Sequence, residues 1–484
     1  MKAWRRLGLF LLFVGVLAPT VMGKVYVRWT QATLPPTKVL GVDEIVIPWS
    51  EQAQGTAATA KKQGYRVYFE ASLEQAGAVT EAAASSRIAG TFLKGSHAEE
   101  SQLEESAQKL RKKYPKQRIL VVVAGGKQPE IRGWLVFNKN GFLQVSSPSQ
   151  QPWLDGNLAL VRYERTFAAQ QTPLYTFSWD ESDPMVKQNG PKPADYSLAI
   201  AEAGAYHADL LLEIHEHQQK GLASKEKESL EDWEPVRKTL AFYERAKDQQ
   251  NEVAAVGILT DDYDSTYEAV NLMARHNIPY RVLHSAKTKA ADLAEYPVIV
   301  AFAAPGKELA EAIRAFAEQG GVAVVVNQPG SYPWDSSGSG KKNGASVTYA
   351  VGNGRVIELA EPVSDPETFA QDVRRLVAKP NVPVSLWNSL TTLVVKYPGE
   401  KPGQAIVELV NYDEETTQVQ VQVKGTYGSV KYEIPGLVCC EALKPAHVDG
   451  FTEFVVPNLL NGGRVYLEGG PTNANDEVKT RTGD

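Results

Sequence analysis

The N-terminal half of the chain alternates short runs of β-branched or aromatic residues with longer, mostly polar segments of helical length. Eight strands are predicted, at residues 25–29, 44–49, 66–71, 88–94, 118–124, within 134–147, 174–179 and 210–216. Repeats of this kind are typical of a (β/α)8 or TIM barrel, which we assign to residues 24–249. The sixth unit is irregular, because Asn138-Lys139-Asn140-Gly141 indicates a hairpin turn and leaves open which arm is the barrel strand.

Two further patterns follow the predicted barrel. Between residues 250 and 380, apolar strands such as 253–259 and 322–327 alternate with helices such as 307–319, which predicts a flavodoxin-like α/β domain. From 381 to 470, period-two alternation in runs such as 405–410 and 417–423 predicts a C-terminal antiparallel β-sandwich. Residues 471–484 are polar and are predicted to be disordered. The expected fold class is therefore α/β, with three domains and a tail.

The first residues have the pattern of an export signal. Lys2, Arg5 and Arg6 precede an apolar run from Leu7 to Met22, and small or apolar residues stand before the expected cleavage near Gly23. This pattern predicts a signal peptide at residues 1–23 and a secreted or periplasmic protein. An uncleaved anchor is the alternative, but the run is shorter than the roughly 20 apolar residues of a comfortable membrane span. We expect no stable membrane span after cleavage.

Charge and cysteine content narrow the possible functions. The chain has 51 Lys and Arg against 57 Asp and Glu, a formal net charge of −6, and removal of the predicted signal peptide makes it more acidic. An acidic chain has no electrostatic reason to bind nucleic acid, so no nucleic-acid partner is expected. The two cysteines, Cys439 and Cys440, are adjacent. If they lie on a strand, they point to opposite faces, which predicts one buried and one exposed thiol and no disulfide framework.

The order of the predicted domains resembles that of the β-galactosidases of glycoside hydrolase family 42. The best local match is Gly352-Asn353-Gly354-Arg355-Val356 followed by Asp365-Pro366-Glu367-Thr368-Phe369, which looks like the glycine turn, strand and closing helix of their second domain. The resemblance implies a middle domain like an inactive class I glutamine amidotransferase, which in that family often mediates oligomerisation. A homo-oligomer formed through the middle domain is therefore one expectation.

The catalytic motif of that family is not matched. The resemblance would place an Asn-Glu pair at the end of strand 4 and a second glutamate at the end of strand 7. Here strand 4 ends Phe92-Leu93-Lys94-Gly95, and strand 7 ends Ser178-Trp179-Asp180-Glu181. The resemblance therefore extends to the architecture and not to the catalytic residues, since a fold does not fix a function.

Barrel enzymes carry their active sites at the C-terminal ends of the strands, so side chains that point inward there are candidates. Period-two alternation turns five polar side chains inward at that mouth: Arg28, Glu70, Asp180, Glu213 and His215. Lys94 is expected at the end of strand 4, near the same mouth. Isolated charges are costly to bury, so a cluster of them at one end of a barrel indicates a functional site.

Glycoside hydrolysis needs two carboxyl groups, about 5–5.5 Å apart for retention or roughly 6.5–9.5 Å for inversion. The leading hypothesis makes Glu213 the general acid, with a pKa raised by burial, and Asp180 the nucleophile or base; Glu70, across the barrel, offers a longer separation. The alternative is a structural ion network in which Arg28 and Lys94 neutralise Glu70 and Glu213. Four tryptophans near the predicted strand ends, Trp29, Trp49, Trp153 and Trp179, would suit stacking against the apolar faces of a sugar.

A metal is the weaker alternative. On a strand, Glu213, His215 and His217 would share a face, as in some metal-dependent hydrolases, but further ligands from other strands are scarce. No metal and no cofactor are therefore expected. The sequence favours an exported glycoside hydrolase-like protein that acts on an oligo- or polysaccharide. A non-catalytic carbohydrate-binding or envelope scaffold protein with a degenerate barrel is the alternative, and a metal-dependent hydrolase is a third.

Overall fold

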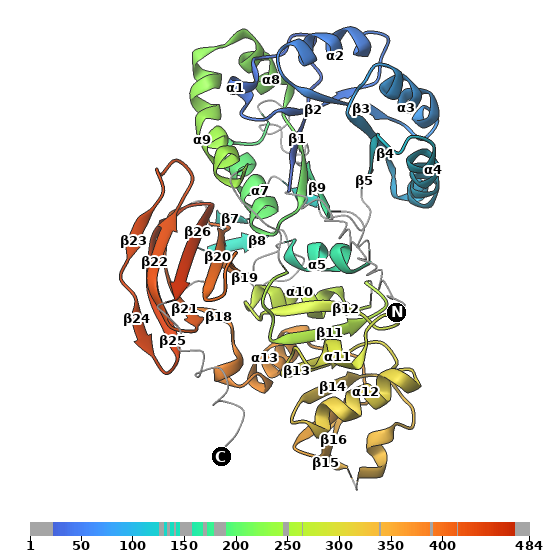
Figure 1. Ribbon diagram of the computed structural model, residues 1–484, viewed down its shortest axis with the longest axis vertical. Helices are drawn as coiled ribbons and strands as arrows, with labels where there is room; N and C mark the ends of the chain where they lie inside the picture. Colours follow the sequence, from blue (N-terminus) through green and yellow to red (C-terminus); the bar gives the residue numbers. More distant parts are fainter. Residues whose placement is uncertain are drawn as a thin grey trace, which may run out of the picture.

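The computed structural model describes residues 23–124, 130–132, 136–139, 142–145, 157–167, 172–178, 190–244, 251–263, 265–337, 340–387, 391–413 and 415–469. The predicted signal peptide, except for Gly23, and the predicted C-terminal tail lie outside these residues. In Figure 1 the barrel lies at the top, the middle α/β sheet below it and the β-sandwich to the left. This arrangement confirms the predicted fold class.

The barrel is a sheet of eight parallel strands that is nearly closed, with β5 and β6 as its two ends. Its strands are β1 (Val25–Arg28), β2 (Glu44–Pro48), β3 (Arg66–Ala71), β4 (Gly90–Ser96), β5 (Arg118–Ala124), β6 (Glu130–Arg132), β9 (Leu174–Ser178) and β10 (Asp209–Glu213). The helices of this part are α1 (Thr37–Leu40), α2 (Ala53–Lys62), α3 (Ala76–Ser85), α4 (Glu100–Lys113), α5 (Leu158–Phe167), α7 (Pro193–Ala205), α8 (Glu216–Ser224) and α9 (Lys227–Glu244).

Alternation along the strands divides the barrel core into two layers. Inward positions form a small cluster whose centre is aromatic: the rings of Tyr26, Tyr68 and Phe92 meet edge to face, with centroids between 5.1 and 5.7 Å apart. Outward positions such as Phe69 and Leu212 belong to the larger core beneath the helices. The inward and outward assignment made from the sequence for β1, β3 and β10 is confirmed, because a period of two fixes the facing of every residue in a strand.

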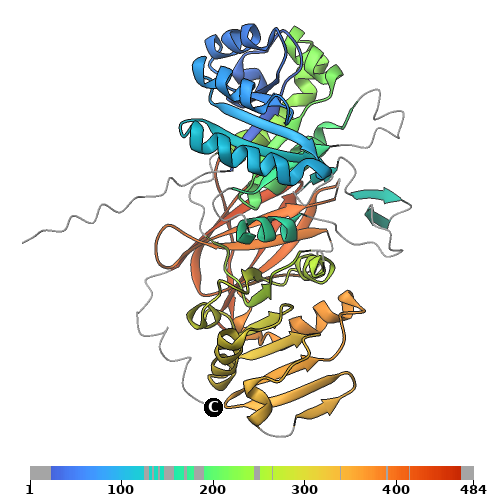
Figure 2. The same cartoon turned by 90° about the vertical axis from the view of Figure 1, so that its right-hand side faces the viewer.

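The sixth barrel strand differs from the prediction. The barrel strand is β6, which pairs in parallel with β9 through Ile131 and Phe177. The two arms of the predicted hairpin, β7 (Val136–Lys139) and β8 (Phe142–Val145), pair only with each other among the described residues and form a separate two-stranded sheet outside the barrel (Figure 2). The predicted hairpin is confirmed, but it is not part of the barrel. The barrel strand β6 (Glu130–Arg132) has only three residues, too few for a recognisable alternation.

Helix α5 packs against the middle domain. Its side chains contact β12 (Tyr280–His284) and α10 (Tyr267–Arg275). Thr166 donates its hydroxyl to the Val282 carbonyl at the sheet edge, and the guanidinium of Arg162 stacks on the Tyr280 ring at 4.1 Å. Helix α5 therefore joins the barrel to the domain that follows it.

The middle sheet has the strand order β12-β11-β13-β14-β17-β16-β15. Its first five strands are parallel and follow the flavodoxin-like 2-1-3-4-5 order. The elements not yet given are β11 (Val256–Thr260), α11 (Ala290–Leu293), β13 (Val298–Ala301), α12 (Lys307–Glu318), β14 (Val322–Val326), β15 (Lys341–Asn343), β16 (Ser346–Val351), β17 (Gly354–Leu359) and α13 (Pro366–Leu376). The predicted glycine turn joins β16 to β17, where Gly352 adopts a φ of +56°, a backbone conformation that favours glycine.

The C-terminal part is a sandwich of two sheets. One contains β18 (Val384–Trp387), β21 (Thr417–Lys424), β25 (Phe451–Leu459) and β24 (Ala446–Val448). The other contains β19 (Thr392–Pro398), β20 (Gln404–Asn411), β26 (Gly462–Gly469), β22 (Tyr427–Glu433) and β23 (Glu441–Leu443). Alternate residues of both sheets form one buried core, as expected for a sandwich.

The prediction that the two cysteines are separate thiols, one buried and one exposed, is wrong. Cys439 and Cys440 lie in the connection between β22 and β23, so the rule that strand neighbours point to opposite faces does not apply. Their sulfur atoms are joined in a disulfide, with Cys439 exposed and Cys440 partly buried. This disulfide links adjacent residues and therefore ties no distant segments together.

Candidate functional site at the barrel mouth

Four charged side chains meet at the C-terminal mouth of the barrel. Arg28 ends β1, Glu70 lies one residue before the end of β3, Lys94 lies near the end of β4 and Glu213 ends β10. Register places Arg28 beside Glu213 on the neighbouring strand, and inward alternation brings the other two toward them. The structure thus gathers four of the residues that were predicted for the site.

The four side chains form two ion pairs that touch. Nε and Nη2 of Arg28 donate to the two carboxylate oxygens of Glu70 at 2.7 and 2.8 Å, a bidentate arrangement. Nζ of Lys94 donates to Oε1 of Glu213 at 2.6 Å, and Nε of Arg28 lies 3.8 Å from that same oxygen. Side-chain exposures between 10% and 32% leave the group within reach of a ligand.

The pairing with carboxylates acts on the pKa of Arg28. Burial lowers the pKa of Arg28, but the hydrogen bond and charge of Glu70, with the charge of Glu213, outweigh it and raise that pKa above its ordinary value. Two cations face two carboxylates, so the quartet is neutral overall. Oε1 of Glu213 is occupied by the ammonium group of Lys94, which donates a hydrogen bond to it.

The carboxylates of Glu70 and Glu213 lie close together. Nε of Arg28 is 2.7 Å from an oxygen of Glu70 and 3.8 Å from an oxygen of Glu213, so the separation of these oxygens cannot exceed the sum of the two distances. That limit includes the roughly 5–5.5 Å of retaining glycosidases and only reaches the lower end of the inverting range. Asp180, the other predicted acid, lies outside the described residues, so its place relative to Glu213 stays a prediction.

The two described tryptophans of the predicted site, Trp29 and Trp49, do not lie on the inward side of the barrel. Trp29 is 1% exposed and donates its Nε1 to the Thr33 carbonyl, so it belongs to the core between strands and helices. Trp49 is partly buried and packs edge to face on Phe69, an outward residue of β3. Neither ring shares the inward side with Arg28. Trp153 and Trp179 lie outside the described residues.

The shared strand face that would have made Glu213, His215 and His217 a metal site is not formed. The strand ends at Glu213, and His215 is the N-cap of α8, with its side chain accepting the backbone N–H of His217 at 3.3 Å. His217 is exposed on the first turn of that helix. Because the chain changes from strand to helix here, the three residues do not share a strand face. His215 stays near the mouth, where its backbone N–H donates to the Tyr196 hydroxyl.

The opposite end of the barrel holds a second ion network that sequence reasoning missed. Asp209, fully buried at the start of β10, accepts hydrogen bonds from Arg118 at 2.6 Å and from the backbone N–H of Lys24 at 2.7 Å. Nζ of Lys24 also donates to Glu44 at 2.6 Å. Burial raises the pKa of Asp209 to about 6, although Arg118 and Lys24 oppose the change. Charged residues at a barrel end therefore do not by themselves mark the functional mouth.

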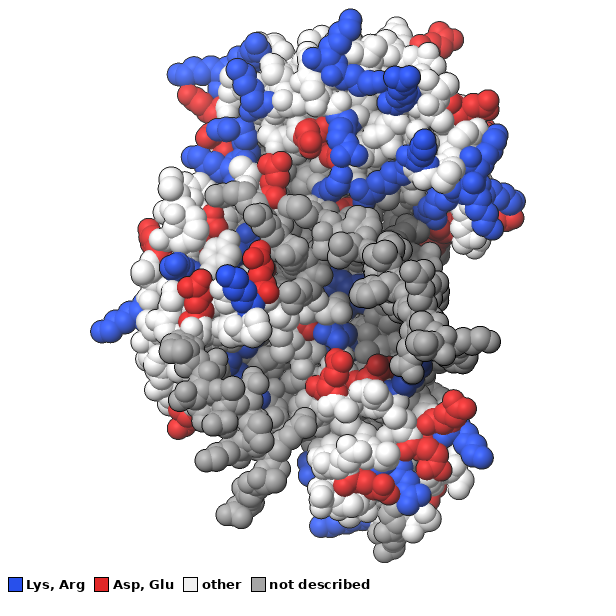
Figure 3. Space-filling model, in the orientation of Figure 1, with Lys and Arg blue, Asp and Glu red and all other residues white. Residues whose placement is uncertain are grey.

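Basic side chains cover part of the barrel surface, although the net charge of the chain is −6. Figure 3 shows Lys and Arg gathered at the top of the molecule, over the barrel helices. A cavity of about 540 Å³ lies between the α3–β4 and α4–β5 connections, with Arg87, Lys113 and Lys116 in its wall. These connections precede their strands, so the cavity opens on the face opposite to the mouth.

No protein-family model and no curated protein sequence matches the chain. In fold, the barrel with its middle α/β sheet and β-sandwich is that of the multidomain glycoside hydrolases, which confirms the resemblance in layout. An α-L-fucosidase, isoenzyme 2 from Paenibacillus thiaminolyticus, has a TM-score of 0.58 and 11% identity, over 93% of this chain and 100% of its own. A β-galactosidase from Rahnella sp. R3 has a TM-score of 0.51 and 10% identity, over 91% and 99%. Identities this low establish the shared fold alone.

Among the described residues, no helix combines the length and the apolar character that crossing a membrane requires.

Proposed function

We propose that the protein is an exported carbohydrate-binding protein with a glycoside hydrolase-like fold, and that it holds an oligo- or polysaccharide at the C-terminal mouth of its barrel. One observation carries the proposal: Arg28, Glu70, Lys94 and Glu213 satisfy one another as two ion pairs and stay partly accessible. Charged donors and acceptors make strong hydrogen bonds to hydroxyl groups, and sugar hydroxyls offer both donors and acceptors. The apolar N-terminal run supports export.

The pairing favours binding over hydrolysis. A general acid must lie within hydrogen-bond reach of the glycosidic oxygen, whereas Oε1 of Glu213 is already bonded to Lys94 at 2.6 Å and lies 3.8 Å from Arg28. The mouth also lacks the Asn-Glu pair of the family that the chain resembles in layout. A barrel that keeps carboxyl groups paired with cationic side chains at its mouth still suits recognition of a polyol.

The test is a binding screen of the purified protein against neutral, acidic and aminated oligosaccharides by calorimetry. Lys94→Met should weaken binding of the best ligand at least tenfold, since loss of a charged hydrogen bond costs about 1.5–3 kcal/mol. Lys24→Met is the matched control, because it removes another Lys–Glu pair of 2.6 Å at the opposite end of the barrel. Equal losses in both variants, or no glycan binding at all, would refute the proposal.

Retaining glycoside hydrolysis is the second candidate, favoured by the closeness of the Glu70 and Glu213 carboxylates. The same ligands are incubated with the protein and the products separated by chromatography. Turnover that disappears in Glu213→Gln and survives in Glu44→Gln, the carboxylate at the far end, would replace binding with catalysis. Binding without turnover would reject hydrolysis.

A further inference from the structure

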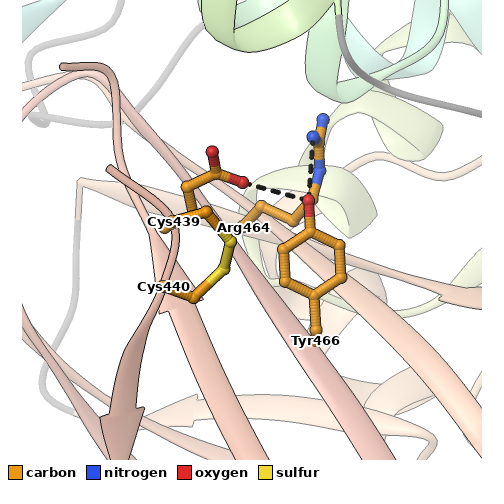
Figure 4. Close-up of a disulfide and its surroundings, with 5 residues drawn as sticks. Cys439, Cys440, Arg464 and Tyr466 are labelled. Atoms are coloured by element: carbon orange, nitrogen blue, oxygen red, sulfur yellow. Dashed lines mark hydrogen bonds between the residues drawn. A yellow bond between two sulfur atoms is a disulfide. The ribbon is translucent and has the colours of Figure 1, made fainter. Parts of the chain in front are cut away.

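A second cluster of reactive side chains lies in the β-sandwich, far along the chain from the barrel mouth. Figure 4 shows the disulfide of Cys439 and Cys440, with Arg464 and Tyr466 of β26 beside it. The connection that carries the cysteines begins directly after Glu433, the last residue of β22. Ligand atoms of Glu433, Cys439 and Cys440 all lie within 4.8 Å of one another.

The carboxylate of this cluster is buried and hydrogen-bonded, whereas the cysteines lie nearer to the surface. Glu433 is 3% exposed, and its Oε2 accepts a hydrogen bond of 3.0 Å from the Tyr466 hydroxyl. That hydroxyl accepts in turn from Nη1 of Arg464 at 3.5 Å. Cys439 is exposed and Cys440 partly buried, whereas Glu433 is buried.

The disulfide has little to contribute to stability. A disulfide stabilises a protein mainly by closing a loop of the unfolded chain, and the effect grows with the length of that loop. The bond between Cys439 and Cys440 joins neighbours in sequence, so it closes no loop of that kind. Its chemical use therefore lies in its reactivity.

We propose that reduction converts this cluster into a binding site for a thiophilic divalent cation of the Zn²⁺ class, with the thiolates of Cys439 and Cys440 and the carboxylate of Glu433 as ligands. Two thiolates and one carboxylate are a ligand set that Zn²⁺ accepts, and a fourth position is left for water. The hydrogen bond from Tyr466 orients the carboxylate, as partners of ligands do in metal sites. This site is independent of the function proposed for the barrel mouth.

The chemistry has two balanced steps. A dithiol reductant transfers two electrons and two protons to the disulfide; the sulfur–sulfur bond breaks, two cysteine thiols form, and the reductant becomes a disulfide. The cation then binds both sulfurs and releases their two protons, because the thiolate is the metal ligand. The oxidised protein has no thiolate and should not bind the cation.

The site touches a contact between domains. The same connection passes over barrel helix α9, where Gly436 lies against the side chain of Lys238.

The test uses Co²⁺ as a spectroscopic substitute for Zn²⁺ on the full-length protein, with and without prior reduction. Reduced protein should bind one Co²⁺ and show the near-ultraviolet thiolate-to-Co²⁺ charge-transfer absorption; oxidised protein should show neither. Cys439→Ser should abolish this absorption. Glu433→Gln should weaken Zn²⁺ binding to the reduced protein at least about tenfold, as loss of a positioned ligand does.

Glu441→Gln is the matched control, since it removes an exposed carboxylate next to Cys440 that is not part of the cluster. It should leave the affinity for Zn²⁺ unchanged. Circular dichroism and thermal unfolding of each variant separate loss of the site from loss of the fold. Failure of the folded, reduced protein to bind Co²⁺ would overturn the proposal, and so would equal affinities in Glu433→Gln and the parent protein.

Discussion

Glu252 occupies the junction between the barrel and the middle domain, and its removal should destabilise both. The carboxylate is 3% exposed and accepts hydrogen bonds from Nε of Arg162 at 3.1 Å and Nη1 of Arg165 at 2.7 Å, both on α5. Its backbone carbonyl also accepts from Arg281. Glu252→Gln keeps the size of the side chain but leaves two guanidinium groups without their charge partner.

Two estimates of the cost agree. Burial acts to raise the pKa of Glu252, but the charges of Arg165 and Arg162 outweigh it and lower the pKa from 4.5 to about 2. At about 1.4 kcal/mol for each pH unit, this change corresponds to about 3 kcal/mol of stabilisation in the ionised form. Breaking a buried ion pair from one side costs about 3–5 kcal/mol. We therefore expect Glu252→Gln to lose about 3 kcal/mol of unfolding free energy at pH 7.

The effect should depend on pH. The unfolded chain protonates Glu252 near pH 4.5, while the folded chain does so only near 2, so the stabilisation is complete above about 4.5 and is lost as the pH falls toward 2. The difference between the parent protein and Glu252→Gln should accordingly narrow between pH 5 and pH 3. Urea unfolding followed by tryptophan fluorescence and by circular dichroism measures both quantities, and coincidence of the two signals tests for a single transition.

The control is Glu318→Gln, which breaks the ion pair with Arg314 on the surface of α12, where both side chains are more than a third exposed. Exposed pairs contribute about 0–1 kcal/mol, so this variant should stay near the parent protein. A loss below about 1 kcal/mol in Glu252→Gln, or a difference that does not change with pH, would show that the junction is not held by this charge.

Two other buried polar groups should be replaceable by apolar side chains without loss of stability. Burial, and to a lesser extent the charge of Lys424, lower the pKa of Lys396 from 10.5 to about 8; the unfolded chain thus keeps a proton that the folded chain loses, and stability should rise between pH 8 and 10.5. Lys396→Met should abolish that rise and stabilise the protein by about 1–3 kcal/mol at pH 7, measured by urea unfolding; a loss of stability would contradict this. The hydroxyl of Tyr26 is buried in the barrel without a hydrogen-bond partner among the described residues. Tyr26→Phe should raise the melting temperature slightly or leave it unchanged, whereas Phe92→Ala beside it should cost about 3–5 kcal/mol.

Local patterns were sufficient for the architecture. A strand period of two and helical segments of regular length predicted the barrel, a flavodoxin-like α/β domain and the sandwich, because both periodicities follow from backbone geometry that every residue shares. The facing of Arg28, Glu70 and Glu213 followed in the same way. The sixth strand was missed because three residues carry too little periodicity to be recognised, and β6 is defined only by its pairing with β9.

The sequence did not predict which residues that are far apart in the chain form ion pairs. The placement of the strands and domains decides which charged residues pair. It brings Lys94 to Glu213 at the barrel mouth and Arg118 to Asp209 at the opposite end. It also brings Arg162 of α5 to Glu252 at the junction with the middle domain. The same holds for Cys439 and Cys440, whose disulfide and nearness to Glu433 depend on a turn and not on a strand. The sequence by itself determined most strands and helices and the facing of residues along β1, β3 and β10, since these are local properties of the chain. Only the tertiary structure decided which charges neutralise one another, because the interaction of two charges depends on their separation and burial, and both are set by the whole fold.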